Sequence, residues 1–182
     1  MKSILLIILA GFFLQVYGQD SLDFASYPKF QNVKCIGKDF PVFKVKNSDS
    51  TYLSNLDFAN HIVFINFWFE QCAPCIAELE GLNKMFDSLK DKKDFLFVSF
   101  TFDDQETINR TRKKFNIKYK VVHIDKTECY RLNCNNGFPT SFIIDKKTKI
   151  VYSISGAQID QTKASQEILS EIYPKILARL SP

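Results

Sequence analysis

The chain has 182 residues, a length that fits one globular domain. Hydrophobic residues make up 46% of the sequence and charged residues 24%, which excludes a disordered or fibrous protein. The formal charge of +4 is modest, and the basic residues are scattered except for one cluster at Arg110, Arg112, Lys113 and Lys114. Such a cluster is typical of a solvated helix face, so we predict no nucleic-acid partner.

The N-terminus predicts export. Lys2 is followed by an apolar stretch from Ile4 to Leu14 and then by Val16-Tyr17-Gly18, a pattern typical of a cleaved signal peptide over residues 1–18. The stretch is shorter than the ~20 residues of a comfortable membrane span, although an uncleaved anchor stays an alternative. We therefore expect a periplasmic or otherwise extracytoplasmic protein, with an N-terminal arm at 19–34 and one domain at 35–182.

The first half of that domain predicts a strand that leads into a helix. The run from Phe40 to Val45 alternates weakly and indicates an edge strand, with a polar turn after it. His61 to Phe69 is almost entirely apolar, as expected of a central strand buried on both faces. From Pro74 to Leu89, apolar residues recur at helical spacing. Two cysteines, Cys72 and Cys75, fall at the junction.

The second half predicts further alternation of strands and helices. Strands are expected at 95–102 and 121–124, with a polar helix at 104–115 between them. A hairpin at 140–155 and a closing helix at 161–180 follow. Lys146-Lys147-Thr148 forms the hairpin turn, and Pro174 should kink or divide the last helix. The pattern predicts an α/β fold with a central mixed sheet and helices on both faces.

Cys72-Ala73-Pro74-Cys75 carries the chemistry that the sequence predicts. Unpaired N–H groups and the helix dipole stabilise a thiolate at a helix start, so Cys72 is the expected nucleophile. Cys75 lies one turn further in and suits the resolving role, in which it attacks a mixed disulfide between Cys72 and a substrate. Pro74 fits the first turn, where its missing N–H matters little. A permanent structural disulfide and half of a zinc site are the alternatives, and the strand-to-helix setting favours redox chemistry.

Three motifs in order resemble one family. Phe67-Trp68-Phe69-Glu70-Gln71-Cys72-Ala73-Pro74-Cys75, then Glu78-Leu79, then Gly137-Phe138-Pro139-Thr140 are similar to the TlpA/ResA group of exported thioredoxin-like oxidoreductases. The resemblance covers roughly 36–156. It implies a thioredoxin-like fold and a thiol-disulfide oxidoreductase that acts on protein disulfides, as a reductase or an isomerase. It also implies electrons from a membrane thiol donor of the DsbD/CcdA type, and it calls for no cofactor or metal.

The resemblance also assigns residues. It implies that Pro139 is cis and faces the cysteines, and that the backbone of Phe138 pairs with an extended substrate. Trp68 packs beside the thiols in the family, and we expect Trp68, Phe138, Pro139 and Thr140 to form the substrate-binding part of the site. Glu78 matches the family's active-site glutamate, which could tune the thiols or relay a proton. A solvent-facing helix glutamate is the alternative for Glu78.

Some positions set this chain apart. Asn66 stands where thioredoxins proper have a buried Asp, and Asn cannot accept a proton in this chemistry. Glu80 replaces a proline that many relatives have, and Phe69-Glu70-Gln71 replaces the more usual small residue and aromatic pair. These departures leave the redox chemistry in place and put substrate preference and potential in doubt.

The other three cysteines leave several pairings open. On one straight helix, Cys129 and Cys134 would lie too far apart for a disulfide, so a bridge between them requires the helix to end first. Free buried thiols and a second redox relay are the other options for that pair. Cys35 could be the unpaired thiol or could bridge to either of them. A zinc site from Cys72, Cys75, Cys129 and Cys134 has acceptable spacings, but the Pro74 setting disfavours it.

Other functions fit the sequence less well. Peroxide reduction needs a Thr where this chain has Phe69, and copper delivery is disfavoured by the C-x2-C spacing. His61 and His123 adjoin predicted strands and are typical of structural histidines. A non-catalytic thioredoxin-fold binding module is the main alternative from a different class, and the intact cysteine pair argues against it.

Overall fold

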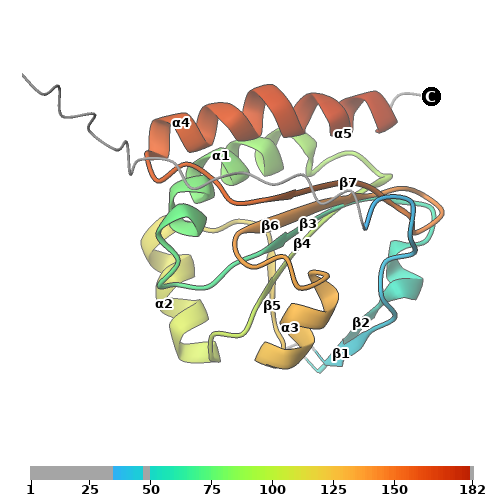
Figure 1. The fold of residues 1–182 in the computed structure, drawn as a ribbon, viewed down its shortest axis with the longest axis horizontal. Coiled ribbons are helices and arrows are strands. Elements are labelled where there is room, and N and C mark those ends of the chain that lie inside the picture. Colours follow the sequence, from blue (N-terminus) through green and yellow to red (C-terminus); the bar gives the residue numbers. More distant parts are fainter. Residues whose placement is uncertain (1–34, 47–49, 181–182) are drawn as a thin grey trace, which may run out of the picture.

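The computed structural model describes residues 35–46 and 50–180. The predicted signal peptide and N-terminal arm lie outside these residues, and the proposed domain boundaries stay a prediction. A mixed five-stranded sheet lies at the centre, in the spatial order β5-β4-β3-β6-β7 (Figure 1). Its strands are β3 (Ile62–Phe67), β4 (Phe95–Thr101), β5 (Lys120–His123), β6 (Thr140–Ile144) and β7 (Ile150–Ser155). The first three run parallel to one another, and β6 and β7 pair antiparallel.

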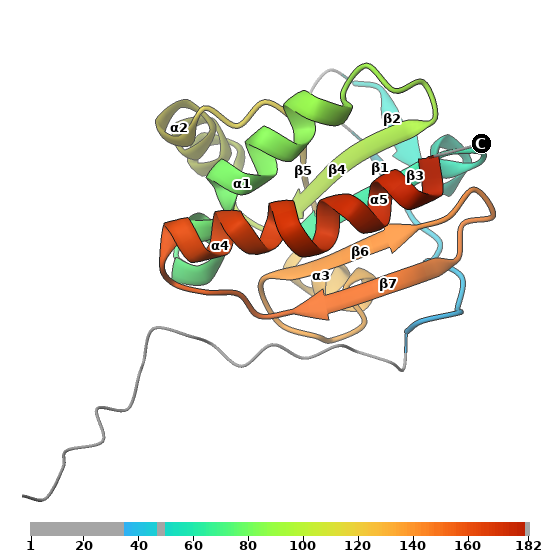
Figure 2. The ribbon, with the colours of Figure 1, turned by 90° about the horizontal axis from the view of Figure 1, so that it is seen from above.

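Helices cover both faces of this sheet. The long helix α1 (Ala73–Leu89) and the C-terminal helices lie on one face, and α3 (Lys126–Leu132) lies on the other (Figure 2). The C-terminal helices are α4 (Gln161–Glu167), the π-helical η2 (Ile168–Ile172) and α5 (Tyr173–Leu180). Helix α2 (Gln105–Phe115) connects the parallel strands β4 and β5. This arrangement confirms the predicted thioredoxin-like α/β fold.

Strand β3 divides the core into two clusters. All six of its residues are buried, as expected of a central strand. Ile62 and Phe64 belong to the helix-side cluster, which continues through Trp68, Leu79 and Leu82 to the C-terminal helices. The alternate residues Val63, Ile65 and Phe67 belong to the α3-side cluster, together with Cys35, Phe40, Phe43, Phe100, Cys129 and Leu132. The period of two along a strand therefore decides which side chains share a compartment.

The edge strand predicted from Phe40 to Val45 is wrong in extent and in place. Strand β1 (Lys44–Lys46) pairs with β2 (Tyr52–Ser54) in a separate two-stranded sheet, and the 3-10 helix η1 (Asn55–Phe58) follows. Phe40 and Phe43 are buried in the α3-side cluster, with ring centroids 5.8 Å apart. Asn55 holds this segment by accepting a hydrogen bond from the Phe43 N–H at 2.7 Å. Burial of the two rings therefore determines the local conformation.

The C-terminal helix divides where the sequence predicts. Pro174 lacks an N–H and cannot donate to the carbonyl of residue 170, and the five residues of η2 end two positions before it. At the other end, α4 approaches α1 closely at Gly81. A Cβ atom at that position would lie 2.8 Å from the Ser165 Cα and 3.1 Å from the Ile168 Cβ. The helix that begins at the cysteine pair is thus fixed against the C-terminal helix.

Candidate active site

Strand register brings the predicted site residues together at one end of the sheet. Phe67, the last residue of β3, pairs with Thr140, the first residue of the antiparallel strand β6. The segment that leaves β3 toward Cys72 and the segment that enters β6 through Pro139 therefore meet at the same sheet edge. The pairing joins two motifs that are far apart in the sequence.

Cys72 and Cys75 form a disulfide at the start of α1. Their Cα atoms are 5.2 Å apart. Cys72 is the N-cap residue, its Sγ accepts a hydrogen bond from the Cys75 N–H at 3.3 Å, and Pro74 lies in the first turn. Cys72 is 6% exposed and Cys75 is 1% exposed. The outer position of Cys72 agrees with the order of roles that the sequence predicts.

The loop before β6 has the geometry that the resemblance implies. The Phe138–Pro139 peptide bond is cis, which confirms that expectation. Pro139 is buried and Phe138 is half-buried. The Phe138 ring meets the Phe69 ring at a centroid distance of 5.3 Å, and it also meets Phe102 at 5.5 Å and Tyr130 at 5.3 Å. The aromatic contact with Phe69 joins the cis-proline loop to the segment that carries Cys72.

Two residues of the predicted substrate-binding set lie in the interior. Trp68 and Thr140 are both 0% exposed, so we expect them to position the site and not to contact a substrate through their side chains. The Thr140 hydroxyl lies 2.9 Å from the Gly137 carbonyl oxygen and 3.0 Å from the Ser155 Oγ. Thr140 therefore fixes the loop before β6, and Trp68 packs in the core directly after β3. The exposed part of the predicted set is Phe138.

Glu78 lies inside the molecule. It is 6% exposed, so the solvent-facing alternative is wrong. Tyr119, itself 1% exposed, lies near it: burial and the Glu78 carboxylate together raise the pKa of the Tyr119 hydroxyl. Asn66 is also buried, and its Nδ2 donates to the Ser141 Oγ at 3.1 Å across the β3–β6 pair. Glu78 is therefore the acidic group that α1 places in the interior, one turn beyond Cys75.

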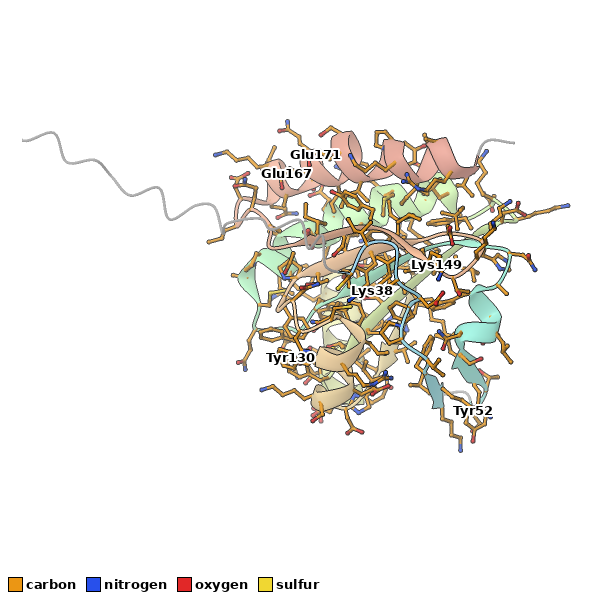
Figure 3. The ribbon with its side chains drawn as sticks, turned by 45° about the vertical axis from the view of Figure 1, so that its right-hand side comes forward. Lys38, Tyr52, Tyr130, Lys149, Glu167 and Glu171 are labelled. Carbon is orange, nitrogen blue, oxygen red and sulfur yellow. A yellow bond between two sulfur atoms is a disulfide. The ribbon has the colours of Figure 1, made fainter. Side chains whose placement is uncertain are left out.

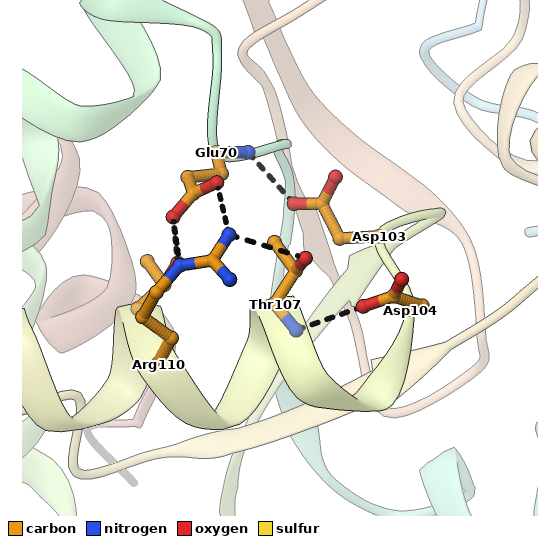
Figure 4. A network of polar contacts seen from close by, with 6 residues as sticks. Glu70, Asp103, Asp104, Thr107 and Arg110 are labelled. Carbon is orange, nitrogen blue, oxygen red and sulfur yellow. Dashed lines mark hydrogen bonds and ion pairs between the residues drawn. The ribbon is translucent and has the colours of Figure 1, made fainter.

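A polar network that the sequence did not predict fixes the segment between β3 and Cys72 (Figure 4). The Glu70 N–H donates to the Asp103 Oδ2 at 2.7 Å, and Arg110 of α2 donates to both Glu70 oxygens, at 3.1 and 2.7 Å. The Arg110 hydrogen bonds lower the pKa of Glu70, while burial raises the pKa of Asp103. The sequence pointed to this segment only through the unusual Phe69-Glu70-Gln71, and it did not indicate which residues would bind Glu70.

Comparison with known families agrees with this geometry. The model of the AhpC/TSA family matches residues 36–153, which is more than half of the chain. The chain belongs to the AhpC/TSA family.

Relatives of this AhpC/TSA-family protein agree in activity. It is 31% identical to the thiol-disulfide oxidoreductase ResA of Bacillus thuringiensis subsp. konkukian, over 76% of this chain and 79% of the relative. It is also 31% identical to ResA of Bacillus anthracis, over 83% of this chain and 84% of the relative. With the Cys72–Cys75 disulfide, these matches make the protein a thiol-disulfide oxidoreductase and confirm the resemblance to the ResA group.

Solved structures of similar fold support the same assignment. A Chlorobium tepidum protein assigned as the thiol:disulfide interchange protein DsbE has a TM-score of 0.67 and 25% identity, over 80% of this chain and 98% of its own. A thiol-disulfide oxidoreductase from Bacteroides fragilis has a TM-score of 0.62 at 21% identity, over 76% and 99%. The second likeness supports the fold of this AhpC/TSA-family protein. Within residues 35–46 and 50–180, none of the helices has the length and apolarity needed to cross a membrane.

The remaining cysteines of this AhpC/TSA-family protein lie across the sheet from the active pair. Cys35, Cys129 and Cys134 are free thiols of the α3-side cluster, whereas Cys72 and Cys75 belong to the helix-side cluster. The four residues of the zinc alternative therefore do not converge. Helix α3 does end at Leu132, between Cys129 and Cys134, and the thiol whose interaction with Cys134 raises its pKa is Cys35.

Proposed function

We propose that this oxidoreductase reduces disulfides in other proteins, with Cys72 as the nucleophile and Cys75 as the resolving residue. The observation that carries the proposal is the position of Cys72 at the N-cap of α1, outside the more deeply buried Cys75. A thiol at a helix N-terminus has its pKa lowered from about 8.5 into a range of about 3.5 to 7.5, so much of it is thiolate near neutral pH.

The reaction follows two exchange steps. In the reduced protein, the Cys72 thiolate attacks one sulfur of a substrate disulfide, forms a mixed disulfide, and releases the other substrate sulfur as a thiolate that takes up a proton. Cys75 then loses its proton and attacks Cys72, which frees the second substrate thiol. The product is the Cys72–Cys75 disulfide that the structure contains. An external dithiol must reduce this disulfide again before the next turnover.

The surroundings of the pair support docking of a protein segment. Phe138 is half-buried beside Phe69, and we propose that its backbone pairs with an extended substrate strand while Pro139 fixes the loop. Next to the pair, a pocket of about 580 Å³ is lined by Glu70, Ala73, Ile76 and other residues of α1, α2 and the C-terminal region. Trp68 and Thr140 are positioning residues in this proposal, because both are buried.

Glu78 is proposed as the group that moves protons for Cys75. It lies three residues after Cys75 on α1 and is buried, so it is shielded from bulk water near the thiol that must lose a proton during resolution. Asn66 cannot take that role. Replacement of Glu78 by Gln should therefore slow release of substrate thiol more than formation of the mixed disulfide.

The compartment and the electron donor are also proposals. The N-terminal pattern of Lys2 and the apolar run up to Leu14 supports export to the periplasm or another extracytoplasmic space. An exported reductase needs electrons from across the membrane, which supports a membrane thiol donor of the DsbD/CcdA type.

Two variants test the mechanism. Cys72→Ser should abolish reduction of insulin disulfides, because the attacking sulfur is gone, and Cys75→Ser should trap mixed disulfides that a reductant releases. Cys129→Ser is the matched control, since Cys129 lies in the other cluster and should leave turnover unchanged. Turnover by the Cys72→Ser variant would overturn the assignment of the nucleophile. The measured reduction potential of the Cys72–Cys75 pair decides the direction of electron flow. A value near −270 mV or below supports a reductase, and a value near −120 mV supports an oxidant.

A further inference from the structure

Cys35 and Cys134 are distant in sequence and adjacent in space. Cys35 is 5% exposed and belongs to the α3-side cluster, and Cys134 is half-buried and packs against the same cluster. The two side chains are neighbours, and the Cys35 thiol adds to the effect of burial in raising the pKa of Cys134. Cys129 lies in this cluster too and is 0% exposed, and burial, Asp103 and Glu128 raise its pKa. Two of the three free thiols are therefore neighbours at one apolar cluster.

Backbone contacts hold Cys35 in this position. The Lys38 N–H donates to the Cys35 carbonyl at 3.2 Å, and the Gly37 N–H donates to the Ile150 carbonyl at 2.8 Å. The Ile150 N–H donates back to the Lys38 carbonyl at 2.9 Å, so the segment is paired with the start of β7. Figure 3 shows Lys38 on this segment and Lys149 on the neighbouring segment that leads into β7. The Cys35 thiol is thus presented from a fixed backbone.

The backbone at Cys134 is equally defined. Cys134 has a φ of 60° and Asn135 has a φ of 58°, a left-handed conformation that residues with side chains adopt uncommonly. The Cys134 N–H donates to the Arg131 carbonyl at 3.3 Å, and the Asn135 N–H donates to the Tyr130 carbonyl at 2.8 Å. Left-handed residues of this kind persist where the surroundings fix them. This turn ends α3 and carries the Cys134 thiol to Cys35.

We propose that Cys35 and Cys134 form a second disulfide, separate from the Cys72–Cys75 pair, that cross-links the start of the domain to the loop before Pro139. The loop is already joined internally, because the Asn133 Nδ2 donates to the Gly137 carbonyl at 2.9 Å and the Asn136 N–H donates to the Asn133 Oδ1 at 3.2 Å. A bond at Cys134 therefore anchors the whole segment that leads into the cis peptide.

The cross-link forms by two exchange steps with a small disulfide such as glutathione disulfide. Cys134 is the more accessible thiol and attacks first as the thiolate, which forms a mixed disulfide and releases one glutathione thiolate that takes up the Cys134 proton. Cys35 then loses its proton, attacks the Cys134 sulfur and releases the second glutathione. Two protein thiols become one disulfide, and one glutathione disulfide becomes two glutathione thiols.

The reaction should be slow and accelerate with pH. Burial, followed by the contact with Cys35, raises the pKa of Cys134 to about 12, so only a small fraction is thiolate near neutral pH. The rate of cross-linking should rise about tenfold for each pH unit between 7 and 9. A bridge of this kind closes a loop of about 100 residues, for which the thermal midpoint should rise by roughly 5 to 15 °C.

The test uses the full chain with Cys72 and Cys75 both replaced by Ser, so that it does not depend on the proposed catalysis. After incubation with glutathione disulfide at pH 8.5, the denatured protein should show one remaining thiol in place of three. A peptide map without reductant should contain the Cys35–Cys134 linked peptide. The thermal midpoint should rise on oxidation, and further replacement of Cys35 or Cys134 by Ser should abolish that rise.

Cys129→Ser in the same background is the matched control, and it should keep both the linked peptide and the rise in thermal midpoint. Three titratable thiols after oxidation would overturn the proposal. So would a linked peptide that contains Cys129, or glutathione that stays attached to Cys134 without transfer to Cys35. Because the map is read from the chain with all three thiols intact, the result does not rely on the folding of the Cys35 or Cys134 variants.

Discussion

Cysteines lie on both faces of the central sheet, in two different environments. On the helix side, Cys72 caps the 17-residue helix α1 and is bonded to Cys75. On the α3 side, Cys129 is fully buried in an apolar cluster, and burial raises its pKa to about 12. The first setting offers backbone N–H groups and a helix dipole to a thiolate, and the second offers neither.

The contrast shows that reactivity in this protein follows from where a thiol is placed. An apolar cluster destabilises the charged form of a thiol, and a helix N-terminus stabilises it. Cys134 has a raised pKa of about 12, as Cys129 does, but its side chain is half-buried and its neighbour is another thiol, Cys35. One small domain thus holds the Cys72–Cys75 disulfide on one face of the sheet and three free thiols on the other.

The largest expected effect is a difference in alkylation rate between Cys72 and Cys129. A pKa of about 12 leaves about one part in 10⁵ of Cys129 as thiolate at pH 7, whereas a thiol at a helix start is substantially ionised. In the reduced protein, iodoacetamide should modify Cys72 at least ~10³-fold faster, as measured by quenched time points and peptide mass spectrometry. As the pH is raised, the alkylation rate of Cys129 should increase about tenfold per pH unit, while the alkylation rate of Cys72 should level off. Equal rates at pH 7 would remove the contrast.

Much of the active pair's setting could be predicted from local sequence. The apolar run before Cys72, the helical spacing after Cys75 and the division at Pro174 are local patterns, and the structure has each element within a few residues of its expected place. The cis bond at Pro139 and the buried Glu78 fit the motifs that resemble the ResA group. Short-range periodicity and motif order were sufficient for these features.

Features that depend on contacts between distant segments could not be predicted from the sequence. The Cys35–Cys134 contact needs the pairing of the domain start with β7, and the Glu70–Arg110 pair needs α2 to lie beside the Cys72 segment. The motif placed Trp68 beside the thiols, but it did not show that the whole side chain would be buried. Phe40 was read as part of a strand because alternation alone does not show that a ring is packed beneath the sheet.

Gly81→Ala should disturb the packing of α1 against α4. The added Cβ would meet the Ser165 Cα at 2.8 Å, a backbone atom that can move only if α4 shifts away from α1. We expect a loss of about 1 to 3 kcal/mol in the free energy of unfolding, or roughly 2 to 10 °C in thermal midpoint, by calorimetry. Ser88→Ala, on the exposed side of the same helix, is the control and should change little. An unchanged midpoint in Gly81→Ala would mean that α1 and α4 are less closely packed.

The smallest expected effect concerns the exposed link between Glu70 and Arg110. The pair joins the Cys72 segment to α2 through two hydrogen bonds, but the Arg110 side chain is 54% exposed, and solvent-exposed ion pairs contribute little to stability. Glu70→Gln should therefore lower the thermal midpoint at pH 7 by no more than about 2 °C. The Glu70 N–H, which donates to Asp103, is unaffected by this change.

The pH dependence of that small effect has a definite sign. The Arg110 hydrogen bonds lower the pKa of Glu70 from 4.5 in the folded protein, so the pair stabilises the fold above pH 4.5 and loses its contribution as the pH falls through the lower folded value. Melting curves of the wild type and Glu70→Gln should differ at pH 7 and converge near pH 3, while the exposed control Asp91→Asn shows no such convergence. A difference that grows at low pH would show that Glu70 acts on the Cys72 segment by packing and not by charge.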